Sequence, residues 1–207
     1  MRLAVGVSAC ALLLAASQAA VACEGKVVLL EDHFESLSPL WTSTGQMAVT
    51  DGKLELKTKS SKSDKVFASP LYQDIDLCAD MALIAGSNLP SIYLGLGFWA
   101  TDAKNLYTFQ ISPTGTAGVY RLKDDKWETV VNDADSAAIH KGRDEVNSLR
   151  VVTVGKTATF YINGEQFGEP FTGEPPAPGQ LIGFVAQASS QSSATFRFDD
   201  ANATVPE

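Results

Sequence analysis

The 207-residue sequence predicts an all-β protein, folded as a two-sheet antiparallel β-sandwich of the jelly-roll type. Hydrophobic and polar residues alternate with period two along almost the whole chain after residue 22, as in half-buried strands. Turn residues separate these runs at short intervals, and no segment carries a sustained helical stripe. A hydrophobic content of 45% and a mean hydropathy of +0.01 are typical of one folded domain with a substantial core.

The first 22 residues have the composition of a secretory signal peptide. Met1-Arg2 provides a positive start, an uncharged apolar run extends from Leu3 to Ala16, and Ala20-x-Ala22 matches the cleavage pattern. The run is too short to cross a bilayer comfortably, which argues against a membrane anchor. We expect cleavage after Ala22, with cleavage after Ala20 as the alternative. Export to the periplasm or the outside and a single domain over residues 23–207 follow.

Cleavage at this position removes Cys10 and leaves two cysteines, Cys23 and Cys78. An even pair in an exported protein favours a disulfide, which would tie the new N-terminus to the strand near 73–84. The alternative is lipidation of Cys23, because Ala20-Val21-Ala22-Cys23 loosely resembles a lipoprotein signal. That alternative leaves Cys78 unpaired, so the disulfide is preferred.

The alternation places strands along the chain in a regular order. In the first strand Val28, Leu30 and Phe34 share a face, and in the next run Leu54, Leu56 and Thr58 do. Asn163-Gly164 is a strong hairpin signal, because both residues tolerate positive φ. A helical turn is expected only within 133–140, and 174–179 is a proline-rich loop. Further strands are expected at 74–83, 91–100, 105–112, 116–123, 126–131, 147–154, 157–163, 180–187 and 194–200.

The central hairpins can be aligned residue by residue. A four-residue connection at 101–104 puts Phe98 opposite Tyr107, and a two-residue turn at Thr114-Gly115 puts Thr108 opposite Arg121. This register predicts a buried aromatic face formed by Leu96, Phe98, Tyr107, Phe109, Tyr120, Leu122 and Trp127. The opposite face is mixed and contains two glycines that leave space for a ligand. Its candidate binding residues are Tyr93, Trp99, Thr108, Gln110, Arg121 and Glu128.

Several stretches resemble a known group of domains. Asp32-x-Phe34, Trp41 and Asp51-Gly52-Lys53-Leu54 are similar to the start of bacterial concanavalin A-like jelly rolls, in the laminin-G-like and 3-keto-disaccharide-hydrolase-like group. The run from Gly95 to Ala100 is similar to their central hairpins, and Phe198-Asp199-Asp200 to a closing strand. The resemblance implies this fold over nearly all of residues 23–207, together with a tendency to associate with carbohydrate. Fold analogy alone does not establish an activity.

Charge and motifs exclude several function classes. A net charge of -8, one unit more negative once Arg2 is lost, argues against a nucleic-acid partner. Neither a phosphate-binding loop nor a nucleophile elbow is present, and two histidines in different contexts do not predict zinc. We expect no cofactor. Calcium is the alternative, bound by the side-chain oxygens of loop residues. The acidic and amide side chains concerned are Asp124, Asp125, Asn132, Asp133 and Asp135.

Glycoside hydrolases of this fold resemble one another in a strand that carries carboxylates at alternate positions. Glu31 and Glu35 share a face but have His33 between them, so the central acid is missing. Asp74, Asp76 and Asp80 share a face with Cys78, and we interpret this row as the solvated outside of a sheet. The leading hypothesis is therefore an exported, non-catalytic protein that binds a carbohydrate or glycan-like ligand. A glycan-processing hydrolase and a structural or interaction protein of the cell envelope are the alternatives.

Overall fold

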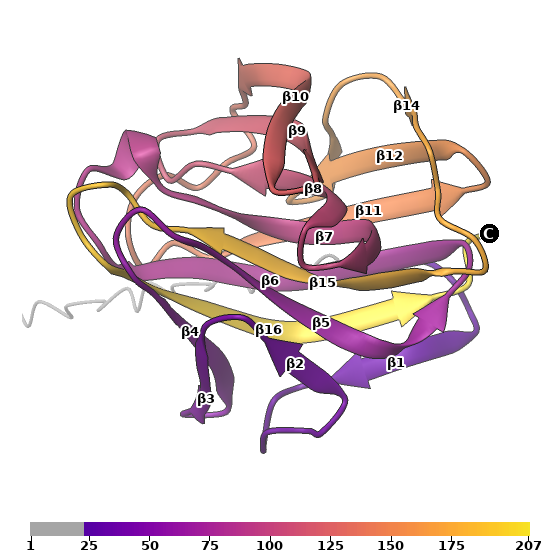
Figure 1. The fold of residues 1–207 in the computed structure, drawn as a ribbon, viewed down its shortest axis with the longest axis horizontal. Coiled ribbons are helices and arrows are strands. Elements are labelled where there is room, and N and C mark those ends of the chain that lie inside the picture. Colours follow the sequence, from indigo (N-terminus) through magenta and orange to yellow (C-terminus); the bar gives the residue numbers. More distant parts are fainter. Residues whose placement is uncertain (1–22) are drawn as a thin grey trace, which may run out of the picture.

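Two antiparallel sheets lie face to face and form a sandwich (Figure 1). The computed structural model describes residues 23–207, so the predicted signal peptide lies outside the described residues. The predicted all-β jelly-roll class is confirmed, with one short 3-10 turn at Leu89–Ser91. No helix among residues 23–207 is long and apolar enough to cross a membrane.

One sheet has nine strands and the other has seven. The nine-stranded sheet has the order β13-β12-β11-β6-β16-β4-β3, with β1 beside β16 and β14 beside β12. Its strands are β1 (Val28–Asp32), β3 (Gln46–Thr50), β4 (Lys53–Thr58), β6 (Ile75–Ala85), β11 (Asn147–Val154), β12 (Thr157–Ile162), β13 (Glu165–Gln166), β14 (Phe171–Thr172) and β16 (Ala194–Thr204). The seven-stranded sheet has the order β10-β9-β8-β7-β15-β5-β2. Its strands are β2 (Trp41–Ser43), β5 (Ser63–Tyr72), β7 (Tyr93–Asp102), β8 (Asn105–Ile111), β9 (Thr116–Lys123), β10 (Lys126–Asp135) and β15 (Gln180–Gln187).

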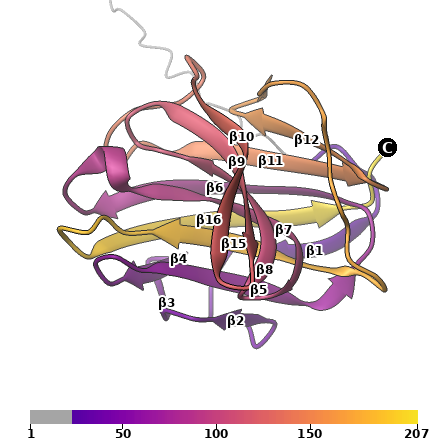
Figure 2. The ribbon, with the colours of Figure 1, turned by 45° about the horizontal axis from the view of Figure 1, so that its top comes forward.

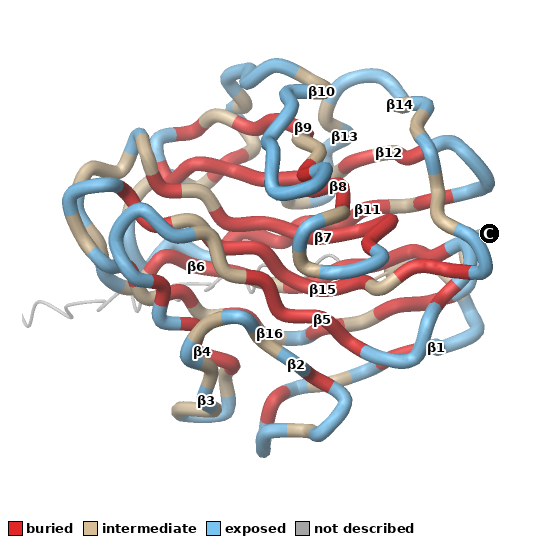
Figure 3. The backbone as a smooth tube through the Cα atoms, viewed as in Figure 1, coloured by how far each residue is buried: buried red, intermediate tan, exposed pale blue. Residues whose placement is uncertain are grey.

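The core lies between the sheets, where the strand centres are buried (Figure 3). Aromatic rings meet across the interface: Phe184 of β15 stacks on Phe198 of β16 at 4.5 Å between centroids. Phe109 of β8 packs on Phe160 of β12 at 4.9 Å. Such ring pairs stabilise the fold by more than the burial of their apolar area alone, because ring edges and ring faces carry opposite partial charges. The two sheets are therefore held by the inward rows of their central strands.

The two-residue turns follow the sequence signals. Asn163-Gly164 has φ values of 49° and 86°, and Asp124-Asp125 has φ values of 50° and 64°, so both pairs adopt the left-handed region that tight hairpins need. The helical turn expected within 133–140 was wrong, because β10 continues to Asp135 and irregular turns follow.

The disulfide between Cys23 and Cys78 is confirmed, with 5.6 Å between the Cα atoms. It anchors the start of the described chain on β6, and it occupies the sulfur that lipidation of Cys23 requires. Asp76, two residues away on the same strand, is 1% exposed, so this part of the row is not a solvated surface as expected. Its carboxylate accepts two hydrogen bonds from Arg150, at 2.7 and 2.9 Å, which is how a buried charge is satisfied.

The predicted register holds between β7 and β8 but fails between β8 and β9. Phe98 lies opposite Tyr107 as expected, whereas Tyr107, and not Thr108, lies opposite Arg121. The β8–β9 turn has three residues, Pro113-Thr114-Gly115, because Ser112 N donates to Thr116 O at 2.8 Å. One extra turn residue moves every side chain of β9 and β10 to the other face. Tyr120 and Trp127 therefore leave the predicted core, and Trp127 is 41% exposed. Leu122 is buried, but on the outer face.

Trp99 was expected on the outer face, and this was also wrong. The β7–β8 ladder is irregular between Phe98 and Asp102, and Trp99 has φ 45°, as expected of a β-bulge that re-aims a side chain. The indole consequently packs with the core rings, 5.3 Å from Phe98 and 5.4 Å from Tyr107. Only 3% of Trp99 is exposed.

Replacement of Phe109 tests this core. Phe109→Ala should lower the free energy of unfolding by about 3–5 kcal/mol, because the cavity left between Phe160 and Phe167 cannot close fully. Leu71→Ala, on an exposed position of β5, is the control and should change it by less than about 0.5 kcal/mol. Urea unfolding followed by fluorescence measures both, and a loss below about 1 kcal/mol for Phe109→Ala would contradict the assigned core.

Candidate functional site

The seven-stranded sheet curls strongly, so that its outer face becomes hollow. Lys65 on β5 and Trp127 on β10 are separated by four intervening strands, which on a flat sheet means roughly 24 Å. The Lys65 Nζ nevertheless lies 5.7 Å from the centre of the Trp127 ring. Figure 2 shows the ribbons of β8, β9 and β10 passing in front of the sheet towards β5. The β9–β10 hairpin thus folds over the outer face.

A small hydrophobic cluster holds this hairpin in place. Leu122 of β9 is buried against the outer face together with Leu106 of β8. The other buried members are Phe67, Ala100 and Val185. This cluster is separate from the main core. Its apolar side chains cover one another on the outer face, which would otherwise expose them to water.

Between the hairpin and the opposite rim lies a groove of about 630 Å³, here named the Trp127 groove. Trp127, Leu122 and Asp125 form one wall. The floor and the opposite wall consist mainly of small polar residues and lysines: Ser61, Lys62, Ser63, Lys65, Ser91, Gln187, Ala188, Ser189 and Ser190. The groove therefore combines one exposed indole with serine side chains, of which Ser61 and Ser190 are exposed and Ser189 is buried.

Lys65 is the charged group of the floor. It is 8% exposed, and its ammonium donates to the backbone oxygen of Ser63 at 3.1 Å. Burial lowers the pKa of Lys65 below its ordinary value, against the opposing effect of Asp64 and Asp125. Within residues 23–207 Lys65 forms no ion pair, since Asp125 is paired with Lys104 at 2.6 Å. The side-chain oxygen of Ser63 is also buried, with no partner among the described residues.

Three of the predicted site residues lie on this same outer face. Thr108 and Gln110 are buried beneath its surface, and Gln110 Nε2 donates to Thr108 Oγ1 at 2.7 Å. Tyr93 is half-buried and contacts Tyr120 edge to face at 6.2 Å. The Tyr120 hydroxyl donates to Asp133, and burial raises the pKa of both phenols. This end of the face is therefore filled by protein groups.

The other three predicted site residues lie elsewhere. Trp99 is in the core. Arg121 lies 5.1 Å from the Tyr107 ring and pairs with Glu174 at 2.6 Å, at the edge of the sandwich. Glu128 lies opposite Arg121 as expected, but it is exposed and directed away from the Trp127 groove. The structure does not bring the six predicted residues into one site.

Sequence reasoning missed Lys65 and Trp127 for different reasons. Trp127 was placed in the core by the two-residue turn assumed at Thr114-Gly115, and Pro113 was the signal for a longer turn. Lys65 has no local signal, because its contact with Trp127 depends on the curl of the whole sheet.

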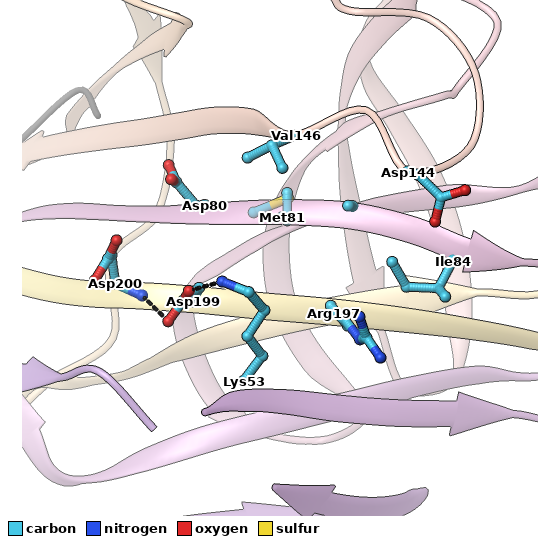
Figure 4. A pocket seen from close by; sticks show the side chains of 10 residues that line it. Lys53, Asp80, Met81, Ile84, Asp144, Val146, Arg197, Asp199 and Asp200 are labelled. Atoms are coloured by element: carbon cyan, nitrogen blue, oxygen red, sulfur yellow. Dashed lines mark hydrogen bonds and ion pairs between the residues drawn. The ribbon is translucent and has the colours of Figure 1, made fainter. Parts of the chain in front are cut away.

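A second hollow of about 300 Å³ lies on the outer face of the nine-stranded sheet (Figure 4). Asp80 of β6 and Asp199 of β16 lie directly opposite each other across the ladder. Asp199 pairs with Lys53, and Asp80 accepts a hydrogen bond from Ser148. Burial raises the pKa of Asp80, with further increases from Asp200 and Asp199. Two carboxylates with different surroundings thus face each other here.

Two of the acids considered for calcium are engaged by other side chains. No group of three His, Cys, Asp or Glu side chains in this range is arranged around a common point. Of the residues considered for calcium, Asp125 pairs with Lys104, and Asp133 accepts the Tyr120 hydroxyl.

Comparisons with known proteins give a fold and no family. No family model and no curated protein matches the sequence. Among solved structures, the carbohydrate-binding module CBM66 from Bacillus subtilis is similar with a TM-score of 0.66 and 14% identity, covering 80% of this chain and 95% of that one. A protein of unknown function with a galectin-like fold from Bacillus subtilis has a TM-score of 0.63 and 14% identity. The match covers 89% of this chain and 99% of that one. A GlcNAcα1-4Gal-releasing endo-β-galactosidase from Clostridium perfringens has a TM-score of 0.62 and 10% identity. The match covers 87% of this chain and 63% of that one.

The chain has the jelly-roll β-sandwich fold that CBM66 and the endo-β-galactosidase share. At these identities the likeness extends to the architecture alone, and both binding modules and enzymes share it. The choice between the two roles depends on this chain's own residues.

The environment of Asp80 predicts a pH dependence of stability. A carboxyl with a raised pKa in the folded state holds its proton more tightly there, so it contributes stability at acidic pH and loses that contribution as the pH rises. Asp80→Asn should therefore melt at a higher temperature than the wild type at pH 7. The difference should vanish below the ordinary Asp pKa of about 3.9. Calorimetry at several pH values measures this, with Glu169→Gln, an exposed carboxylate, as the control. A lower melting temperature of Asp80→Asn at pH 7 would contradict the assignment.

Proposed function

We propose that this protein is an exported, non-catalytic carbohydrate-binding module whose ligand occupies the Trp127 groove. The observation that carries the proposal is the exposed indole of Trp127 in a groove rimmed by hydroxyl groups. A sugar presents apolar C–H patches to an aromatic ring and hydroxyls to polar side chains, and this groove offers both kinds of contact. The likeness to CBM66 supports the proposal at the level of fold.

The compartment is part of the same proposal. The signal-peptide pattern of residues 1–22 and the disulfide between Cys23 and Cys78 both fit an oxidising compartment, the periplasm or the outside. Membership of the laminin-G-like and 3-keto-disaccharide-hydrolase-like group belongs to the proposal as well, supported by the sequence resemblance. A structural or interaction protein is less well supported, because the groove is polar and hollow and not a flat apolar patch.

The role of Trp127 can be tested by replacement. Trp127→Ala should abolish glycan binding while changing the unfolding midpoint little, because its ring is 41% exposed and stacks on ligand and not on core. A glycan array identifies a ligand, and titration calorimetry with wild type and variant measures the affinity. Trp99→Ala is the matched control, because it removes the same side chain from a buried position in the core.

The two tryptophan variants should differ in kind. Trp99→Ala should lose about 3–5 kcal/mol of stability, since its ring fills the space beside Phe98 and Tyr107. Unchanged affinity of Trp127→Ala for an array-identified glycan would remove the groove from the proposal.

A hydrolase is the second candidate, and the Asp80–Asp199 pair favours it. Residues directly opposite in an antiparallel ladder have Cβ atoms roughly 4.5–5.5 Å apart. A retaining glycosidase needs its two carboxyl groups about 5–5.5 Å apart, with one protonated as the acid. The raised pKa of Asp80 suits the acid, and Asp199 is the carboxylate paired with the Lys53 ammonium.

This candidate makes a separate prediction. If the hollow hydrolyses glycans, both Asp80→Asn and Asp199→Asn should lose at least about 100-fold in turnover, the usual contribution of acid–base catalysis. Product analysis by mass spectrometry over a panel of oligosaccharides measures the activity, and Glu169→Gln is again the control. Absence of any cleavage by the wild type would remove the hydrolase, whereas cleavage lost in both variants would overturn the non-catalytic role.

A further inference from the structure

The floor of the Trp127 groove carries a charge that the protein does not neutralise. Lysine is rarely buried without a partner, because removing an ammonium from water is costly. Lys65 is 8% exposed, yet its direct hydrogen-bond partner is a neutral oxygen, that of Ser63. No carboxylate of residues 23–207 forms an ion pair with it. Elsewhere this chain pairs its buried cation fully, as Arg150 does with Asp76 and Glu24.

The nearby acids are directed to other partners. Asp64 precedes Lys65 on β5, so its side chain points to the other face, where it accepts a hydrogen bond from Thr44 at 3.2 Å. Asp125, at the tip of the β9–β10 hairpin, is held by Lys104. Lys65 therefore lines the groove with no carboxylate of residues 23–207 paired to its ammonium, and the buried Ser63 hydroxyl also lacks a partner among the described residues.

The local charge around the groove is opposite to that of the whole protein. The chain has a net charge of -8, but the groove is lined by Lys62 and Lys65 against one acid, Asp125. A neighbouring hollow shares Lys62 and adds Lys57 and Lys59, with Asp64 as its acidic residue. A cationic rim on an acidic protein concentrates an anionic ligand at this one place.

We propose that the ligand of the Trp127 groove is an acidic saccharide, in which an anionic substituent pairs with Lys65 while the sugar ring lies on Trp127. The ammonium lies over the Trp127 ring, 5.7 Å from its centre, so a sugar unit on the exposed part of the indole would place its substituent beside Lys65. The missing counter-charge of Lys65 is then supplied by the ligand as a carboxylate of a uronic acid or a sulfate ester. This inference rests on the proposed binding function and adds the chemical class of the ligand.

The test compares an acidic probe with its neutral form. Trigalacturonate, its methyl ester and a sulfated galactan oligosaccharide are titrated into the wild type, Lys65→Met, Lys65→Arg and Lys156→Met. Lys156 is exposed in a turn of the other sheet, so its replacement changes the net charge equally without touching the groove. The wild type should bind an acidic probe at least about tenfold more tightly than the neutral ester, and more weakly as salt rises. Lys65→Met should remove this preference, Lys65→Arg should retain part of it, and Lys156→Met should leave it unchanged.

A melting measurement without ligand separates binding from structure. An uncompensated buried charge destabilises the folded state, so Lys65→Met should be at least as stable as the wild type. A large loss of stability would show that Lys65 serves the fold, and would overturn the inference.

The outcomes distinguish the two proposals. Preference for trigalacturonate assigns the uronate, and preference for the sulfated probe assigns the sulfate. Binding of neutral glycans that needs Trp127 but is indifferent to Lys65 overturns the acidic class and leaves the binding function standing. Failure of every probe, and of every glycan on an array, overturns both.

Discussion

The three-residue turn at Pro113-Thr114-Gly115 sets which side chains of β9 and β10 face the outside of the sandwich. Gly115 adopts φ 105°, which a side chain would disfavour, and Ser112 closes the turn onto Thr116. Because strand side chains alternate with period two, this one turn sends Leu122 and Trp127 outward and Arg121 towards Tyr107. The hydrophobic cluster that holds the hairpin, the aromatic wall of the groove and the ion pair of Arg121 with Glu174 all follow from that register.

The curl of the seven-stranded sheet depends on packing at both faces. The inner face carries large rings that meet the nine-stranded sheet, whereas the outer face carries Gly95, Gly97 and Gly183 in neighbouring strands. A Cβ at Gly95 or Gly183 would meet the backbone of the neighbouring strand, so glycine lets these strands lie close together. Leu122 packs with Leu106 on the same face. The groove is the space left between the hairpin and the strand end at Gln187, so its shape is a consequence of how the sheet covers its own outer side.

The two outer faces treat charge differently. On the nine-stranded sheet, cations and acids are paired across neighbouring strands, as with Arg150 and Asp76 or Lys53 and Asp199. Those pairs satisfy groups that packing has removed from water. On the seven-stranded sheet the buried Lys65 has a cation–π contact and donates to a backbone oxygen, and it forms no ion pair with an acid of residues 23–207. That contrast supports the proposal that the outer face of the seven-stranded sheet binds a ligand.

The sequence by itself determined the all-β class, most strand positions, the β7–β8 register and the pairing of Cys23 with Cys78, because alternation, turn residues and an even cysteine count are local or nearly local signals. It did not determine the faces of β9 and β10, since a turn of two residues and a turn of three are both compatible with Pro113-Thr114-Gly115. The bulge at Trp99 was equally hidden, because the ring moves inward to meet Phe98 and Tyr107 from the same sheet and Phe171 from the other. Only the tertiary structure decided that Lys65 and Trp127 meet. They are 62 residues apart in the chain and are separated by four strands in the sheet. They come together because the curled sheet buries the apolar side chains between them.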